Sequence, residues 1–147
     1  MITTRRFTRK DARSVGKFIV KVELEFIKKI DKFILEQYTP KHILDKWPGT
    51  YVLILEENKK IIGVGRAKPN GWITHVFIHK KYRNKGVGKR LMSRLEYWLK
   101  RKEIKEFQLN SSPYAVNFYK TLGYESNGRK KIYYGLAIYP IKKSLFK

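Results

Sequence analysis

A basic, glycine-containing stretch directs the interpretation of this chain: Arg83-Asn84-Lys85-Gly86-Val87-Gly88-Lys89. It lies between a predicted strand at 72–79 and a predicted amphipathic helix at 87–101. The two glycines let the backbone approach a ligand with no Cβ in the way. The first N–H groups of the helix are unpaired, and with the helix dipole and the basic side chains they suit a pyrophosphate. The simpler alternative is a basic turn that merely precedes a helix.

This stretch differs from the two commoner phosphate-binding loops. The P-loop pattern G-x-x-x-x-G-K-[ST] does not occur in it. A dinucleotide fingerprint needs three glycines and an acidic residue after the next strand, whereas the next predicted strand here ends in Asn110.

Upstream of the glycine stretch, the hydrophobic pattern predicts a helix and several strands. The helix is expected over residues 17–38, where Ile27, Ile30 and Ile34 recur at helical spacing. A loop is expected from Pro40 to the Pro48-Gly49 pair. Strands are expected at residues 2–7, 51–56, 61–68 and 72–79. Short polar turns join the last three, which therefore predict an antiparallel meander.

Downstream, the pattern predicts alternating helices and strands. After the helix at 87–101 come a strand at 107–110, a short helix and a final strand at 129–139. Ser112 and Pro113 are expected to open the short helix as N-cap and first helical residue, and Gly123 to close it. We therefore expect an α/β (α+β) fold in a single domain, residues 1–147. Its central sheet should be mixed, mostly antiparallel and flanked by helices.

Composition excludes several classes of function. The 147 residues include no cysteine, which excludes a disulfide scaffold, a thiolate nucleophile, Cys-type zinc sites and iron–sulfur clusters; we expect no metal. The apolar run 51–55 is far too short to span a bilayer, and the basic first 14 residues have no apolar segment behind them. We expect a cytoplasmic protein with no membrane partner.

The charge is extreme for one small domain. Lys and Arg total 34 and Asp and Glu total 12, which gives a net charge of +22. Such a surface attracts anions, and an acidic protein, an RNA or the ribosome could be the partner. The alternative is that lysine only keeps the protein in solution.

Residues 72–124 resemble the acyl-CoA-binding core of the GCN5-related N-acetyltransferase (GNAT) family. The resemblance is close over about a third of the chain and architectural over the rest. In residues 112–124, an alanine, an aromatic-Tyr pair and a Gly-aromatic stop resemble the family's second signature. The matching segments are Val76-Phe77-Ile78, Tyr82-Arg83-Asn84-Lys85-Gly86-Val87-Gly88 and Ser112-Pro113-Tyr114-Ala115-Val116-Asn117-Phe118-Tyr119-Lys120-Thr121-Leu122-Gly123-Tyr124.

The resemblance implies that acetyl-CoA, as co-substrate, lies between two splayed strands. Backbone groups of residues 76–78 would line the pantetheine and acetyl group, and one N–H would stabilise an oxyanion. The loop 84–89 would hold the pyrophosphate. Tyr119 matches the family tyrosine that protonates the departing thiolate. The implied cofactor-binding residues are Val76, Phe77, Ile78, Arg83, Asn84, Lys85, Gly86, Val87, Gly88, Lys89, Asn110, Ser112 and Asn117.

The general base is less clear from the sequence. Many family members use a glutamate on the third meander strand or on the strand after the glycine-loop helix. Here residues 72–79 contain no acid, and the matching place on the later strand is Phe107 or Gln108. His75 is the nearest titratable side chain, and its ordinary pKa suits a base at neutral pH. A structural histidine, a water chain or an amine that arrives deprotonated are alternatives. The acceptor site is expected between residues 24–38, the following loop and the last strand, where Tyr133 and Tyr134 could line it.

The implied function is an N-acetyltransferase that moves an acetyl group to a primary amine by direct attack on the thioester. The acceptor stays open between a protein N-terminus, a small-molecule amine and a nucleic-acid-associated target, and the protein could be a monomer or a homodimer. Two alternatives remain. A nucleic-acid-binding module would use the basic and aromatic residues at 80–83 and 129–134, and a GNAT-fold acetyl-CoA sensor would lack catalysis.

Overall fold

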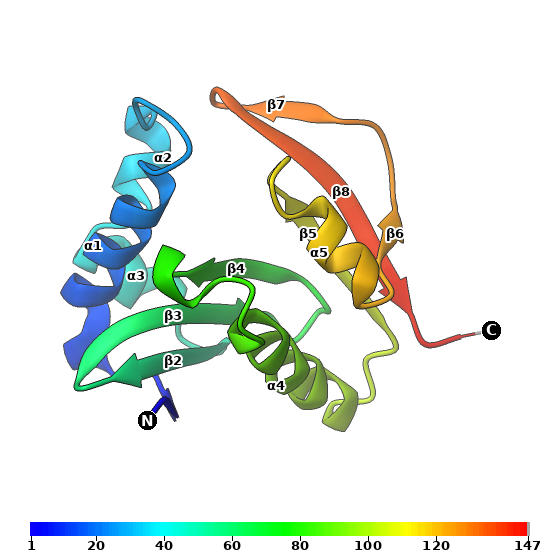
Figure 1. The fold of residues 1–147 in the computed structure, drawn as a ribbon, viewed down its shortest axis with the longest axis horizontal. Helices are drawn as coiled ribbons and strands as arrows, with labels where there is room; N and C mark the ends of the chain where they lie inside the picture. The colour runs from blue at the N-terminus through cyan, green and yellow to red at the C-terminus, as the bar shows by residue number, and fades with distance from the viewer. Residues whose placement is uncertain (147) are drawn as a thin grey trace.

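The strands form two antiparallel sheets that lie side by side (Figure 1). The computed structural model describes residues 1–146. The first sheet has the order β1-β2-β3-β4, and the second has the order β5-β8-β6 with β7 paired to β8. This arrangement confirms the expected mostly antiparallel sheet flanked by helices. None of the helices within residues 1–146 is long and apolar enough to cross a membrane.

The first sheet contains the predicted meander. Its strands are β1 (Thr3–Arg6), β2 (Tyr51–Glu57), β3 (Lys60–Ala67) and β4 (Ile73–Ile78). Asn58 and Lys59 both have positive φ angles, +53° and +62°, as a two-residue hairpin turn requires. The predicted turns therefore join the strands in the expected order.

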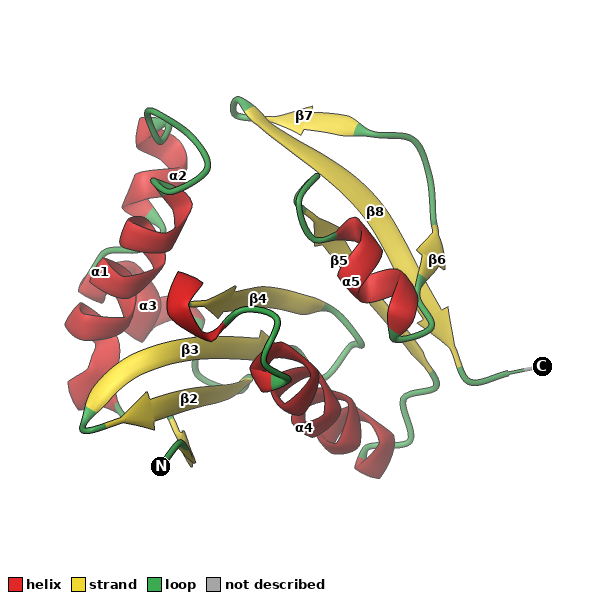
Figure 2. Ribbon diagram, in the orientation of Figure 1, coloured by secondary structure: helices red, strands yellow, loops and turns green. Residues whose placement is uncertain are grey.

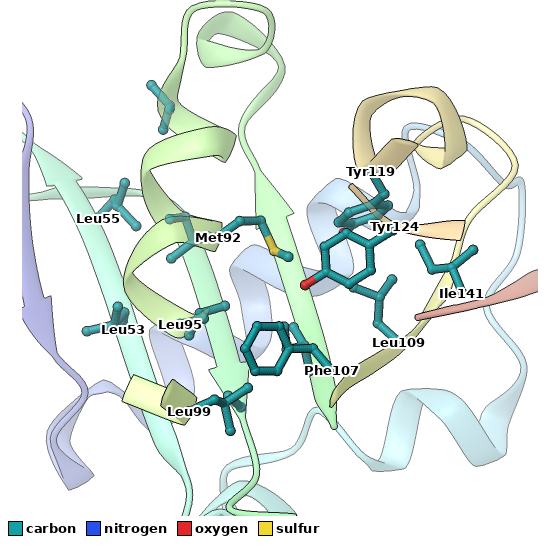
Figure 3. Close-up of a cluster of buried hydrophobic side chains, with 14 of the residues drawn as sticks. Leu53, Leu55, Met92, Leu95, Leu99, Phe107, Leu109, Tyr119, Tyr124 and Ile141 are labelled. Atoms are coloured by element: carbon teal, nitrogen blue, oxygen red, sulfur yellow. The ribbon is translucent and has the colours of Figure 1, made fainter. Parts of the chain in front are cut away.

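Side chains alternate between the two faces of this sheet, and each face has its own helices. Leu53 and Leu55 of β2 pack against α4 (Val87–Arg101) in a cluster shown in Figure 3. Val52 and Ile54 face the opposite side and pack with α1 (Ala12–Glu23) and α3 (Pro40–Lys46). The helix α4 has the bounds that its apolar stripe predicts.

The second sheet is formed by the last third of the chain. Its strands are β5 (Glu106–Ser111), β6 (Glu125–Ser126), β7 (Lys131–Tyr133) and β8 (Leu136–Ser144), and α5 (Val116–Thr121) lies beside it. Two short 3₁₀ helices, η1 (Arg9–Asp11) and η2 (Lys80–Tyr82), complete the fold.

Two predictions near the N-terminus are wrong. The helix expected at 17–38 ends at Glu23, and a separate short helix, α2 (Lys32–Glu36), begins where the Asp31 side chain accepts a hydrogen bond from Phe33 N–H. Pro40 starts α3 instead of a loop, because Thr39 caps that helix and proline suits its first position.

Two predictions near the C-terminus are also wrong. The final strand expected at 129–139 is a hairpin, because Tyr134 and Gly135 have φ angles of +47° and +82° and turn the chain between β7 and β8. Ser112 is not an N-cap: the chain makes a turn first, in which Ala115 N–H donates to the Ser112 carbonyl, and α5 begins at Val116.

Candidate active site

Strands β4 and β5 meet at one point and then separate. Trp72 and Gln108 form an isolated parallel bridge, and Gln108 N–H donates to the carbonyl of Gly71 at 3.0 Å. From there β4 pairs only with β3 and β5 pairs with β8, so the two strands diverge (Figure 2). Gly71 has a φ of +101°, and a Cβ there would stand 2.7 Å from the carbonyl oxygen of Glu106. A glycine is therefore needed where the two sheets join.

The divergence leaves one edge of β4 without a partner strand among residues 1–146. Val76, Phe77 and Ile78 pair with Gly65, Val64 and Gly63 of β3 on their other edge. Unpaired backbone groups at a strand edge can bind a ligand by hydrogen bonds. The expected splayed strand pair is present, and residues 76–78 lie on its inner edge.

The glycine loop lies at the end of β4 and leads into α4. Asn84 and Gly86 adopt positive φ angles of +60° and +80°, and Gly86 is the N-cap of α4. The helical hydrogen bonds begin with Arg90 N–H to the Gly86 carbonyl. The N–H groups of residues 87–89 thus have no carbonyl partner in the helix. Lys85 and Lys89 are exposed beside them, so the loop combines free donors with positive charge.

Arg83 has a different set of contacts from those expected of a phosphate ligand. Its Nε donates to the Ile78 carbonyl at 3.1 Å, and its Nη2 pairs with Glu25 at 2.7 Å. The guanidinium also lies over the Phe26 ring at 4.7 Å, and Phe26 stacks on Tyr114. In this structure Arg83 joins the glycine loop to the end of β4 and to the turn after α1.

Tyr119 lies on α5 with its ring between the two sheets. It is 5% exposed, and its ring packs edge-on to Tyr124 at 5.8 Å (Figure 3). Burial raises the pKa of Tyr119 above its ordinary value. Its hydroxyl makes no hydrogen bond to another side chain or backbone group of residues 1–146. At neutral pH this hydroxyl is therefore protonated and free to donate.

A buried ion pair fixes the segment that carries Tyr119. The carboxylate of Glu96 on α4 accepts a hydrogen bond from the Tyr124 hydroxyl at 2.7 Å and pairs with Lys143 on β8 at 3.0 Å. The pair joins α4, the turn after α5 and β8. Tyr124 accordingly has a structural role.

The family is decided by comparison with known proteins. A family model described as an acetyltransferase (GNAT) domain matches residues 13–145. This chain belongs to the GNAT family. An uncharacterized N-acetyltransferase, ycf52, of Gracilaria tenuistipitata var. liui is 36% identical over 100 residues, or 63% of this chain and 53% of that protein. The chain thus spans about half the length of the curated relatives it matches.

Solved structures show the same GNAT fold. The PaiA N-acetyltransferase of Thermoplasma acidophilum, solved in complex with coenzyme A, superposes with a TM-score of 0.81 at 15% identity, covering 98% of this chain and 99% of that one. A GNAT acetyltransferase of Staphylococcus aureus Mu50 has a TM-score of 0.81 at 20% identity, covering 99% and 100%.

Three polar residues expected near the cofactor of this GNAT domain lie along one segment. Asn110, Ser112 and Asn117 are all exposed, at the end of β5, in the following turn and in the first turn of α5. The buried neighbour is Ser111, whose hydroxyl donates to the Ser112 carbonyl at 2.7 Å. These three residues follow one another along the chain from the end of β5 into α5.

His75 lies on β4 among aromatic rings. Its ring is 5.2 Å from Trp47 and 6.2 Å from Tyr38, and its Nδ1 contacts the Thr74 hydroxyl at 2.8 Å. Burial, with a smaller effect of Arg66, lowers the pKa of His75 to about 3. The imidazole is therefore neutral and weakly basic at neutral pH. Residues 1–146 hold no group of three His, Cys, Asp or Glu side chains that could bind a metal.

One half-buried acid of this GNAT domain, Glu23, stands in none of the recognisable sequence motifs. Glu23 is the last residue of α1, and its side chain is half-buried. Burial raises the pKa of Glu23 above its ordinary value, and the Tyr38 hydroxyl lowers it in part. Glu23 follows Ile19 by one helical turn and so extends the apolar face of α1. The chain has only 12 acids, so an acid one helical turn after a buried residue is the sequence signal that could have identified Glu23.

Proposed function

We propose that this GNAT domain transfers the acetyl group of acetyl-CoA to a primary amine by direct attack of the amine on the thioester. The observation that carries the proposal is the single bridge between β4 and β5, after which the strands separate beside the glycine loop. Because the strands are already separated there, acetyl-CoA can bind between them without breaking hydrogen bonds of a paired sheet. The fold that this chain shares with the coenzyme A complex of PaiA supports it.

The residues along this divergence fit the parts of acetyl-CoA. The free N–H groups of 87–89, with Lys85 and Lys89, suit the pyrophosphate. The inner edge of residues 76–78 suits the amides of the pantetheine, which need both donors and acceptors. Asn110, Ser112 and Asn117 offer polar groups from the β5 side. Arg83 would keep the loop in place through its contacts with Ile78 and Glu25.

The reaction forms one bond and breaks one. The amine nitrogen bonds to the thioester carbon, and the carbonyl oxygen becomes an oxyanion that a β4 N–H can stabilise. The C–S bond then breaks, and the thiolate takes the proton of the Tyr119 hydroxyl. The nitrogen loses one proton as it becomes an amide, and a proton returned through solvent restores the Tyr119 hydroxyl. The Tyr119 hydroxyl carries its proton at neutral pH, and its lack of a partner among residues 1–146 leaves it available to the thiolate; burial raises its pKa and so makes it a weaker acid than an exposed tyrosine.

The acceptor is proposed to bind between the α1–α2 segment and the β7–β8 hairpin. Phe33 of α2 stacks on Tyr134 at 4.2 Å and meets Tyr133 edge-on at 6.5 Å. These contacts join two elements that flank the divergence of β4 and β5 (Figure 1). Tyr133 and Tyr134 are about half exposed, so they offer aromatic surface to an amine substrate.

The first test is a thermal-shift titration with acetyl-CoA in about 0.2 M salt, which screens non-specific attraction to the basic surface. We expect saturable stabilisation by acetyl-CoA, a smaller shift with ADP, and loss of the shift in Gly86→Glu. The matched control is Gly49→Glu, because Gly49 has a similar φ (+84° against +80°) and equally open surroundings in the turn before β2. Both variants introduce the same negative charge and a similar backbone strain. They differ only in whether that charge lies in the glycine loop.

The outcomes separate the alternatives. Equal shifts with any polyphosphate, or none with acetyl-CoA, would overturn the cofactor site, and steeply salt-dependent polynucleotide binding would then favour a nucleic-acid-binding module. Saturable acetyl-CoA binding without acetylation of any amine would instead favour an acetyl-CoA sensor.

A further inference from the structure

We propose that residues 100–105 and 145–146 form a surface that binds single-stranded nucleic acid. This α4-end surface consists of the last two residues of α4, the turn that follows them and the C-terminal tail. The proposal goes beyond acetyl transfer and does not depend on it.

The α4-end surface contains an open cavity of about 580 Å³, which is lined by Lys100, Glu103, Ile104, Lys105 and Leu145. A backbone hydrogen bond of 2.8 Å from Leu145 N–H to the Lys105 carbonyl holds the tail beside the residue that precedes β5. Two of the lining side chains are apolar and two are cationic. A nucleotide combines an apolar base face with an anionic phosphate, so the chemistry of this cavity matches one.

The basic side chains of the α4-end surface are available to an anion. All four are exposed, and no ion pair within residues 1–146 involves them: Lys100, Arg101, Lys102 and Lys105. Glu103 is the single acid of the surface. A polyanion can contact several of these bases at once and releases counterions as it does so. The surface therefore favours a chain of phosphates over a single anion.

Aromatic rings accompany these bases and favour nucleic acid over other polyanions. Lys105 Nζ lies over the Phe146 ring at 5.7 Å, and Lys102 Nζ lies over the Trp98 ring at 5.0 Å. Phe146 is 66% exposed, so a base can stack on it. Proteins that bind single strands combine cations along the phosphates with rings on which the bases stack. An acidic polypeptide would use only the cations, and a duplex keeps its bases stacked on one another.

The α4-end surface is separate from the proposed acetyl-CoA and acceptor sites. The glycine loop lies at the other end of α4, and a helix of 15 residues that rises about 1.5 Å per residue separates the two by roughly 20 Å. The β7–β8 hairpin and α4 lie on opposite sides of the molecule (Figure 1). Nucleic acid and acetyl-CoA should therefore bind at the same time.

The test is fluorescence anisotropy with a labelled single-stranded RNA of about 12 nucleotides in about 0.15 M salt. Phe146→Ala leaves the net charge unchanged and should weaken binding about 5- to 100-fold, the loss of one stacked base. The matched control is Tyr134→Ala, which removes an exposed ring from the β7–β8 hairpin and should bind as tightly as the wild type.

The salt dependence of the same binding tests the contribution of charge. Lys100→Ser/Lys105→Ser removes two phosphate contacts, so the slope of log Kd against log salt should fall by about 1.4. Lys59→Ser/Lys60→Ser removes the same charge from two exposed residues of the β2–β3 turn and should keep the slope of the wild type. Thermal melting of each variant checks that it is folded.

Three results would overturn the inference. Wild-type affinity in Phe146→Ala, or equal affinity for polyglutamate and the RNA, would mean that charge alone causes the binding. Tighter binding of a duplex of the same sequence would exclude base stacking on this surface. Displacement of the RNA by acetyl-CoA would place the nucleic acid at the glycine loop instead. None of these results would affect the proposed acetyl transfer.

Discussion

Tyr119 combines a protonated hydroxyl with the absence of any hydrogen-bond partner among the described residues. If it protonates the thiolate, Tyr119→Phe should lower kcat by about 10²- to 10³-fold. The stabilisation by acetyl-CoA should not change, because the aromatic ring stays in place. Steady-state kinetics that follow CoA release with a thiol reagent measure the first quantity, and thermal shift measures the second.

The control for Tyr119 is Tyr97→Phe, which removes an exposed hydroxyl on α4. Its kcat should match that of the wild type. Equal rates for Tyr119→Phe and the wild type would show that the thiolate leaves without this acid.

Glu23 should have a measurable effect on stability. Its pKa is raised in the folded protein, so the unfolded state loses the proton at lower pH. The charged carboxylate therefore reduces stability as pH rises from the ordinary glutamate pKa near 4.5 toward neutrality. We expect Glu23→Gln to be more stable than the wild type at pH 7, and the difference to shrink near pH 4.

Urea denaturation at the two pH values tests this effect, with Glu36→Gln as the control. A difference that does not depend on pH would mean that burial does not affect the ionisation of Glu23. The comparison needs no substrate, so it is independent of the kinetic test.

The junction of β4 and β5 depends on one glycine. Gly71 and Gly49 both have positive φ angles, but only at Gly71 would a Cβ meet a backbone oxygen, that of Glu106 at 2.7 Å. Gly49→Ala should cost about 1 kcal/mol in the free energy of unfolding, because alanine disfavours this φ. Gly71→Ala should cost about 1–3 kcal/mol more, since the two sheets must separate.

Equilibrium urea denaturation measures both costs. Because the shift at Gly71 also moves the start of β4, stabilisation by acetyl-CoA should weaken in Gly71→Ala only. Equal costs in the two variants would mean that the sheets adjust freely at this point.

The local pattern predicted those elements whose signals lie within them. The bounds of α4 follow from its apolar stripe, and the β2–β3 turn follows from its polar residues. The helices between residues 24 and 46 were missed because their ends depend on caps at Asp31 and Thr39 inside a continuous apolar pattern.

The same distinction holds for the site. The glycine loop and Tyr119 belong to recognisable motifs. The sequence therefore predicted that the loop precedes α4 and that Tyr119 lies on the short helix α5. The close approach of the Tyr38 backbone to α1 depends on the missing Cβ of Gly16, which is a tertiary effect. The pairing of Arg83 with Glu25 could not be predicted from the sequence, because the two residues are 58 positions apart.

The net charge of +22 includes six exposed bases on the elements that flank the proposed acceptor site. They are Lys28, Lys29 and Lys32 on one side, where the acids Asp31 and Glu36 are also exposed, and Arg129, Lys130 and Lys131 on the other. Ion pairs within residues 1–146 involve none of these six side chains. A polyamine would be repelled on approach, whereas an amine followed by acidic groups would be attracted.

We therefore expect the enzyme to prefer a peptide N-terminus followed by acidic residues over one followed by basic residues. The preference in kcat/KM should be about 10-fold or more at low salt and should shrink as salt screens the surface. The double variant Lys130→Glu/Lys131→Glu should lose most of it. Lys59→Glu/Lys60→Glu, an adjacent pair at the β2–β3 turn on the other side of the molecule (Figure 1), should keep it. If both double variants lose the preference equally, the overall charge attracts the acceptor and the bases beside β7 have no special role.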